Sequence, residues 1–70
     1  MYIYYVRYSI YDSEGEKIAE GNGEVSLESP ILYYEEIEII SDVIKEEFKK
    51  SEMPEAEMVI IDFYNFLRQE

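Results

Sequence analysis

The chain has 70 residues, of which 47% are hydrophobic and 16% aromatic, and its formal net charge is −11 at pH 7. This length allows a single domain, residues 1–70, and this apolar content excludes an acidic disordered tail. The acidity argues against direct binding to nucleic acid or to an anionic membrane, since phosphate groups repel such a surface.

The first predicted strand covers residues 2–11, YIYYVRYSIY, which are mostly β-branched or aromatic. Its even-numbered positions would face one side of a sheet and its odd-numbered positions the other. The strand is followed by DSEG, residues 12–15. Because glycine tolerates positive φ, Gly15 predicts a tight hairpin turn with a G1-type bulge.

The second predicted strand is EKIAEGNGEVSLE, residues 16–28, and its apolar pattern changes parity along its length. A bulge at residues 21–23, Gly-Asn-Gly, would bring Ile18, Val25 and Leu27 to one face. The strand is also rich in charge and glycine, which a sheet edge tolerates better than a sheet centre. We therefore place it at an edge.

A helix is predicted next, with Ser29 as N-cap and Pro30 as its first residue, or with a start one turn later near Tyr33. Apolar residues then recur every three or four positions, which indicates an amphipathic helix as far as Lys50. Pro54 is the stop signal. The apolar stripe consists of Tyr33, Ile37, Ile40, Ile44 and Phe48, with Ile39 and Val43 on one flank.

The third predicted strand is EMVIIDFYNF, residues 57–66, and it is apolar at both alternating sets of positions. The order is therefore strand, strand, helix, strand, and the helix returns the chain to the start of the sheet. A right-handed crossover past a central first strand predicts a ββαβ domain of the α+β class. Its three-stranded antiparallel sheet has order 2-1-3, with one helix packed on one face.

One helix covers only one face of a sheet, so apolar side chains should remain exposed on the other. If Val59, Ile61 and Phe63 face the helix, an exposed tyrosine-rich patch follows, although the reverse parity is equally compatible with the sequence. That patch would contain Ile3, Tyr5, Tyr11, Met58, Ile60 and Tyr64. Such a patch is typical of an interface, and a homodimer would enlarge a small core. Alternatively, the tyrosines lie half-buried with their hydroxyls in water.

Signals for catalysis or metal binding are weak in this chain. The chain has no His and no Cys, which excludes imidazole bases, imidazole ligands and thiolates. Residues 21–23 precede a strand rather than a phosphate-binding helix start, and residues 12–16 lack the ligand spacing of an EF-hand. We therefore predict no enzyme, and no catalytic, cofactor-binding or metal-binding residues.

Four carboxylates, the acidic ridge, fall on the helix side opposite the apolar stripe: Glu35, Glu38, Asp42 and Glu46. Their spacing of three or four residues gives steps of roughly 5–6 Å along the helix. Phosphates along one DNA strand are about 6–7 Å apart, a similar scale. The ridge could therefore bind a basic nucleic-acid-binding protein in place of DNA. The alternative is a solvated helix face that maintains solubility.

In size, acidity and lack of catalytic residues, the whole chain resembles the small inhibitors carried by phages and mobile elements, including anti-CRISPR and anti-restriction proteins. The resemblance transfers no residue, but it implies a protein partner such as a nuclease, repressor or CRISPR effector. The alternative function is a structural or assembly module that forms a homodimer through the tyrosine-rich patch. No signal-peptide pattern and no apolar run of roughly 20 residues is present, so we expect a cytoplasmic protein.

Overall fold

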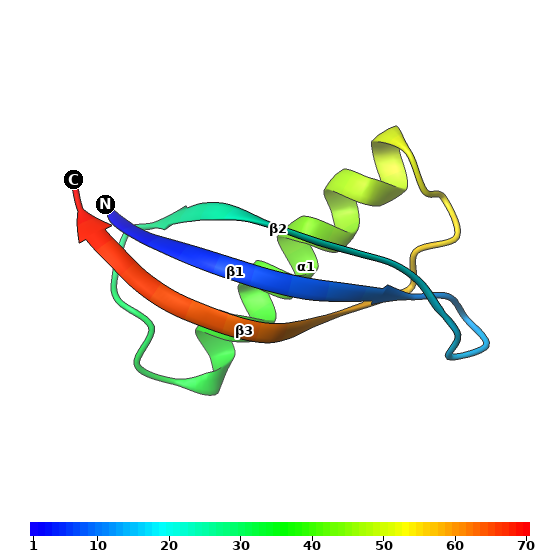
Figure 1. The fold of residues 1–70 in the computed structure, drawn as a ribbon, viewed down its shortest axis with the longest axis horizontal. Coiled ribbons are helices and arrows are strands. Elements are labelled where there is room, and N and C mark those ends of the chain that lie inside the picture. Colours follow the sequence, from blue (N-terminus) through cyan, green and yellow to red (C-terminus); the bar gives the residue numbers. More distant parts are fainter.

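The computed structural model describes residues 1–70 and contains three strands and one helix. In chain order they are β1 (Tyr2–Tyr11), β2 (Lys17–Leu27), α1 (Tyr34–Ser51) and β3 (Met58–Gln69) (Figure 1). The sheet order is β2-β1-β3, and β1 pairs antiparallel with both neighbours. These observations confirm the predicted ββαβ fold of the α+β class and its strand order 2-1-3.

The hairpin between β1 and β2 is organised by Asp12 and Gly15. The Asp12 carboxylate accepts hydrogen bonds from the backbone N–H groups of Glu14 and Glu16, both at 2.9 Å. The Gly15 N–H donates to the Asp12 carbonyl at 3.1 Å, and Gly15 has a φ of +81°. A turn closed in this way, with glycine in the left-handed region, is the predicted G1-bulge hairpin.

The bulge predicted at residues 21–23 is wrong, because the extra residue of β2 is Ile18. Ile10 lies opposite Ala19 and Tyr11 lies opposite Lys17, which leaves Ile18 without a partner. Residues 21–23 pair in regular register with β1. Gly21 lies instead beneath the Tyr8 ring, so glycine provides space there rather than a change of register.

Helix α1 begins at Tyr34, so the later of the two predicted starts is correct and Ser29 is not the N-cap. The Glu36 carboxylate accepts a hydrogen bond from the Tyr33 backbone N–H at 2.9 Å, which satisfies one donor at the helix start. The preceding residues 28–33 form a loop with bends, in which the Ile31 N–H donates a hydrogen bond to the Tyr4 hydroxyl at 2.9 Å. The helix ends at Ser51, before Pro54.

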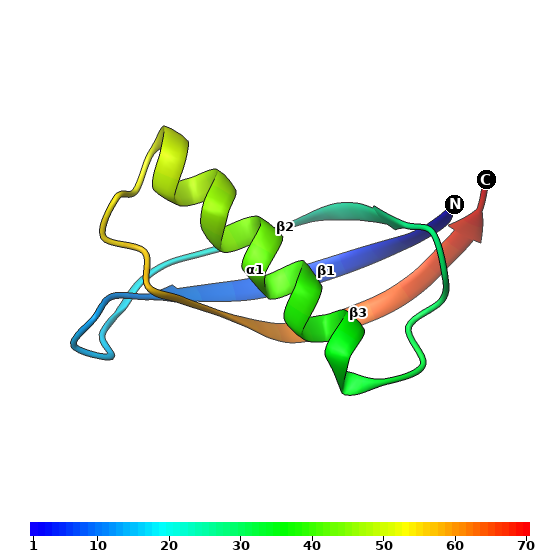
Figure 2. The ribbon, with the colours of Figure 1, turned by 180° about the vertical axis from the view of Figure 1, so that it is seen from behind.

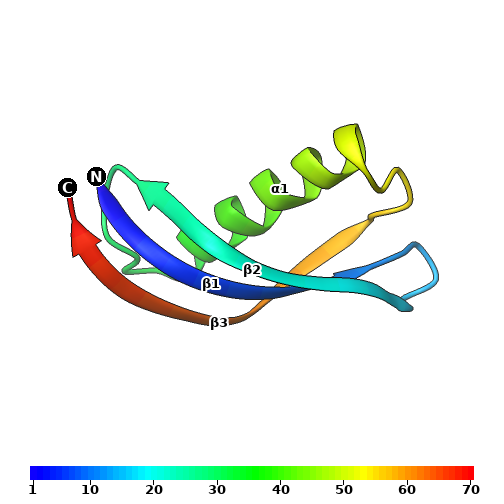
Figure 3. The same ribbon diagram turned by 45° about the horizontal axis from the view of Figure 1, so that its top comes forward.

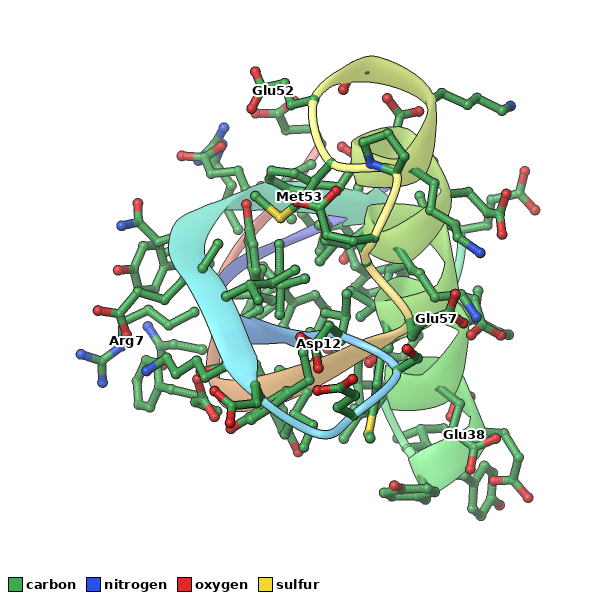
Figure 4. The ribbon with its side chains drawn as sticks, turned by 90° about the vertical axis from the view of Figure 1, so that its right-hand side faces the viewer. Arg7, Asp12, Glu38, Glu52, Met53 and Glu57 are labelled. Atoms are coloured by element: carbon green, nitrogen blue, oxygen red, sulfur yellow. The ribbon has the colours of Figure 1, made fainter.

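The helix crosses one face of the sheet diagonally, and the opposite face, called the open face, carries no other element (Figures 1, 2 and 3). Even-numbered residues of β1 face the helix, and the Tyr8 and Phe48 rings meet edge to face with centroids 5.9 Å apart. The core is small and contains Ile10, Ala56 and Val59. Ile44, Phe48 and Met53 pack against it, so it lies under the second half of α1. Figure 4 views this end of the molecule and labels Met53.

Strand β3 contains two bulges that change which side chains face the helix. Asp62 is the extra residue between Ile61, opposite Tyr8, and Phe63, opposite Arg7, while Leu67 is extra near the end of the strand. Val59 and Ile61 face the helix as expected, but Phe63 does not. Each bulge reverses the alternation of the strand, which the sequence pattern did not reveal.

Beyond the first bulge, the faces of Phe63 and Tyr64 are the reverse of the prediction. Phe63 lies on the open face, with its ring centroid 6.2 Å from that of Tyr5. Tyr64 turns to the helix side, with its ring centroid 6.2 Å from that of Tyr4.

The molecule has no helix that is both long enough and apolar enough to cross a membrane.

Candidate interaction surfaces

The four carboxylates of the acidic ridge are all exposed on α1. None of them takes part in an ion pair. Glu38 projects from the helix on the side away from Arg7, which lies on the open face of the sheet (Figure 4). The ridge is therefore a row of exposed carboxylates, none of which is ion-paired.

Four of the six cations of the chain are engaged elsewhere. Lys17 pairs with Glu20, and Lys49 with Glu57, at 2.8 Å and 3.6 Å. Arg68 pairs with both Glu24 and Glu70, and the Arg7 guanidinium lies 4.8 Å from the centroid of the Phe63 ring. Hydrogen bonds to Glu20 raise the pKa of Lys17, and hydrogen bonds to Glu70 and Glu24 raise that of Arg68. Only Lys45 and Lys50 make no such contact.

The six residues predicted to form a tyrosine-rich patch do not share one surface. Met58 and Ile60 are exposed, at 48% and 42%, whereas Tyr5 and Tyr11 are partly buried. Ile3 is only 4% exposed, because Arg68 lies opposite it and reaches across β1 to Glu24. Tyr64 lies on the helix side, as described above. The exposed apolar surface is therefore shifted from the centre of the sheet to β3.

Strand β3 is an edge strand, because it pairs only with β1. Over its 12 residues it carries only two charged side chains, Asp62 and Arg68. Six large apolar side chains of β3 are 40–49% exposed: Met58, Ile60, Phe63, Tyr64, Phe66 and Leu67. The other edge strand, β2, has no large exposed apolar side chain and carries Lys17, Glu20 and Glu24. Charge is the usual protection of a sheet edge, and β3 largely lacks it.

An open groove of about 690 Å³ lies between α1 and β3 and is named the α1–β3 groove. Eight of its 12 lining residues are hydrophobic. The helix contributes Tyr34, Ile37, Glu38, Ser41 and Asp42, and the strand contributes residues 58–64. Two residues of the acidic ridge thus border an apolar groove. One sequence signal points to this groove. The third strand is apolar at both alternating sets of positions, and the predicted sheet order places it at an edge.

Two polar groups lie outside these surfaces, the Ser9 hydroxyl and the Tyr8 phenol. The Ser9 hydroxyl donates a hydrogen bond to the Asp62 carboxylate at 2.6 Å, beside a smaller hollow on the open face. Burial raises the pKa of the Tyr8 phenol, and the negative charge of Glu52 raises it further. No group of three or more carboxylates is arranged to hold a metal ion.

No protein-family model, no curated protein and no solved structure matches this chain. Its function is therefore inferred from two surfaces of the molecule, the acidic ridge and the exposed edge of β3 with the α1–β3 groove.

Proposed function

We propose that this protein is a non-enzymatic inhibitor that binds the basic nucleic-acid site of another protein and blocks it by occupancy, as a DNA mimic does. The observation that supports this proposal is the acidic ridge, whose four carboxylates are exposed and unpaired while most cations are engaged elsewhere. Lys and Arg side chains that normally contact phosphate oxygens also bind carboxylates with charge-assisted hydrogen bonds.

The net charge of −11 supports the same mode of binding at longer range. A field of one sign steers an oppositely charged partner and raises the association rate. Salt screens such a field, with a screening length of about 10 Å at 0.1 M. The complex should therefore weaken as salt concentration rises.

The test is capture of a partner from source-cell lysate on the immobilised protein, followed by elution with duplex DNA or with increasing salt. The ridge variant carries Glu35→Gln, Glu38→Gln, Asp42→Asn and Glu46→Gln. Its matched control neutralises four exposed, unpaired carboxylates away from the ridge. The control substitutions are Glu14→Gln, Glu16→Gln, Glu28→Gln and Glu55→Gln. Both variants lose four negative charges, so only the position of the charge differs.

We expect the wild type and the control to retain the same partner and duplex DNA to displace it. The ridge variant should bind about 30-fold more weakly, because four exposed ion pairs at about 0.5 kcal/mol each sum to about 2 kcal/mol. Equal retention by the ridge variant and the control, or a partner that duplex DNA does not displace, would contradict the proposal.

Assembly of copies of this chain is a second proposal, and the exposure of Met58 and Ile60 on the open face supports it. A homodimer through that face would have the mass of two chains by light scattering, and replacing the exposed Met58 and Ile60 with Ser would return it to the monomer. A monomer over the whole accessible concentration range would contradict this role.

A further inference from the structure

The outer edge of β3 offers backbone hydrogen-bonding groups that the fold leaves without a strand partner. β3 pairs only with β1, so one of its two edges is free along the strand. An added strand would pair with these groups, as occurs when an extended peptide joins an exposed sheet edge. The apolar side chains on both faces of β3 would then contact the side chains of the added strand on both faces.

The helix shapes the space beside this edge. The N-terminal end of α1 extends past β3 on the side away from β1 (Figures 1 and 2). The α1–β3 groove therefore has the strand along one side and Tyr34, Ile37 and Ser41 of the helix on the other. An extended chain is narrow enough to lie along such a groove, whereas a helix of about 10 Å diameter would not reach the backbone of β3.

The charges around the groove indicate the chemistry of the segment that fits it. Glu38 and Asp42 border the groove on the helix side, whereas the Asp62 carboxylate bonds to Ser9 on the open face. Neither Glu38 nor Asp42 takes part in an ion pair. Lysine or arginine side chains on the helix-facing side of an added strand would complement these two carboxylates. The alternating apolar side chains would lie on its other side, next to Met58, Ile60 and Phe63 on the open face.

We propose that the α1–β3 groove binds an extended segment of a protein partner, with alternating basic and apolar residues, as a fourth strand on β3. This inference rests on the proposed basic partner and specifies how part of that partner is bound. A second copy of this chain fits less well, because it also carries a net charge of −11. The only cation that its β3 contains, Arg68, is already paired with Glu24 and Glu70.

The probe is the synthetic peptide KVKIKVK with blocked ends, which is as long as the part of β3 that lines the groove. Two control peptides separate charge from backbone pairing. EVEIEVE reverses the charge, and KVKPKVK keeps the charge but removes a backbone N–H and disfavours a regular strand. Affinity is measured by NMR titration, and strand addition by hydrogen exchange of the β3 amides.

Two charge-reversal variants locate the site. Glu38→Lys with Asp42→Lys changes two carboxylates that line the groove, and Glu35→Lys with Glu46→Lys changes two of the same ridge that do not. All four residues are exposed, so both variants should fold. The two variants also have equal net charge.

We expect KVKIKVK to bind, to slow exchange of β3 amides within residues 58–64, and to bind at least tenfold more tightly than either control peptide. The groove variant should lose at least tenfold in affinity for KVKIKVK and the Glu35/Glu46 variant less than threefold. Absence of binding, unchanged exchange of the β3 amides, or equal loss in both variants would overturn the inference.

Each of these failures can be separated from failure of the proposed function. Equal loss in both variants would assign the binding to the ridge as a whole, which leaves the DNA-mimic proposal intact. That proposal fails on different observations, namely a captured partner that does not require the ridge or is not displaced by DNA. A mass of two chains by light scattering, with β3 amides already protected before peptide is added, would assign the edge to a second copy and overturn the inference.

Discussion

At the scale of single residues, two glycines of β2 that look alike in sequence have different surroundings. A Cβ atom on Gly21 would lie 2.7 Å from the Tyr8 hydroxyl oxygen and 2.8 Å from the ring carbon that bears it. A Cβ atom on Gly23 would meet nothing within 4 Å. Neither glycine has a positive φ, so the difference between them is one of space and not of backbone conformation.

We therefore predict opposite effects of alanine at these two sites. Gly21→Ala should lower the free energy of unfolding by about 1–3 kcal/mol, because the Tyr8 ring must move away from its packing on Phe48. Gly23→Ala should raise it by about 0.5–1 kcal/mol, because alanine loses less conformational entropy on folding. Urea denaturation of both variants measures the difference. Equal effects at the two sites would contradict the assigned role of Gly21.

This pair also shows which part of a residue's role could be predicted from sequence. Gly15 was assigned correctly, because the turn depends on the few residues around it. The sequence pattern predicts a bulge at Gly21, and this is wrong because the role of Gly21 depends on Tyr8 in the neighbouring strand. The order of residues along one strand does not reveal a contact with a side chain on the neighbouring strand.

At the scale of elements, the start of α1 depends on one side chain. The N-cap residue Tyr33 makes no capping hydrogen bond with its own side chain. The Glu36 carboxylate instead accepts a hydrogen bond from the Tyr33 N–H at 2.9 Å. Glu35 lies in the same first turn, and its negative charge interacts favourably with the helix dipole as that of Glu36 does. Glu35 makes no capping hydrogen bond.

The comparison of these two acids predicts the strength of the cap. Glu36→Ala should lower the free energy of unfolding by about 1 kcal/mol, the usual effect of losing a capping bond. Glu35→Ala should lower it by only a few tenths of a kcal/mol, since it removes a charge–dipole interaction alone. Urea denaturation followed by circular dichroism measures both values. A Glu36→Ala variant as stable as Glu35→Ala would show that the bond does not stabilise the helix.

Element order and sheet order could be predicted because strand alternation and helical periodicity are local patterns. The parity of β3 could not, since the bulges at Asp62 and Leu67 arise from its pairing with β1. For the same reason, the predicted faces of Phe63 and Tyr64 are wrong. The acidic ridge followed from helical spacing, whereas the α1–β3 groove depends on how α1 crosses β3, which no local pattern specifies.

At the scale of the whole molecule, a small core carries a large charge of one sign. Only eight of the 70 residues are buried, and the net charge is −11. Short chains of this kind have little stability in reserve, and self-repulsion lowers it further. The acidic ridge adds to this repulsion, because its carboxylates lie in a row without ion pairs.

We therefore predict that salt stabilises the folded protein. From about 0.01 M to about 1 M NaCl the screening length falls from ~30 Å to ~3 Å, and the free energy of unfolding should rise by about 1 kcal/mol. The ridge variant described above should be more stable than the wild type at low salt and should respond less to salt. Thermal and urea unfolding at each salt concentration measure both effects. If salt raises the free energy of unfolding equally in the wild type and the ridge variant, repulsion along the ridge does not limit stability. Neutralising the ridge would then have removed none of the repulsion that salt screens.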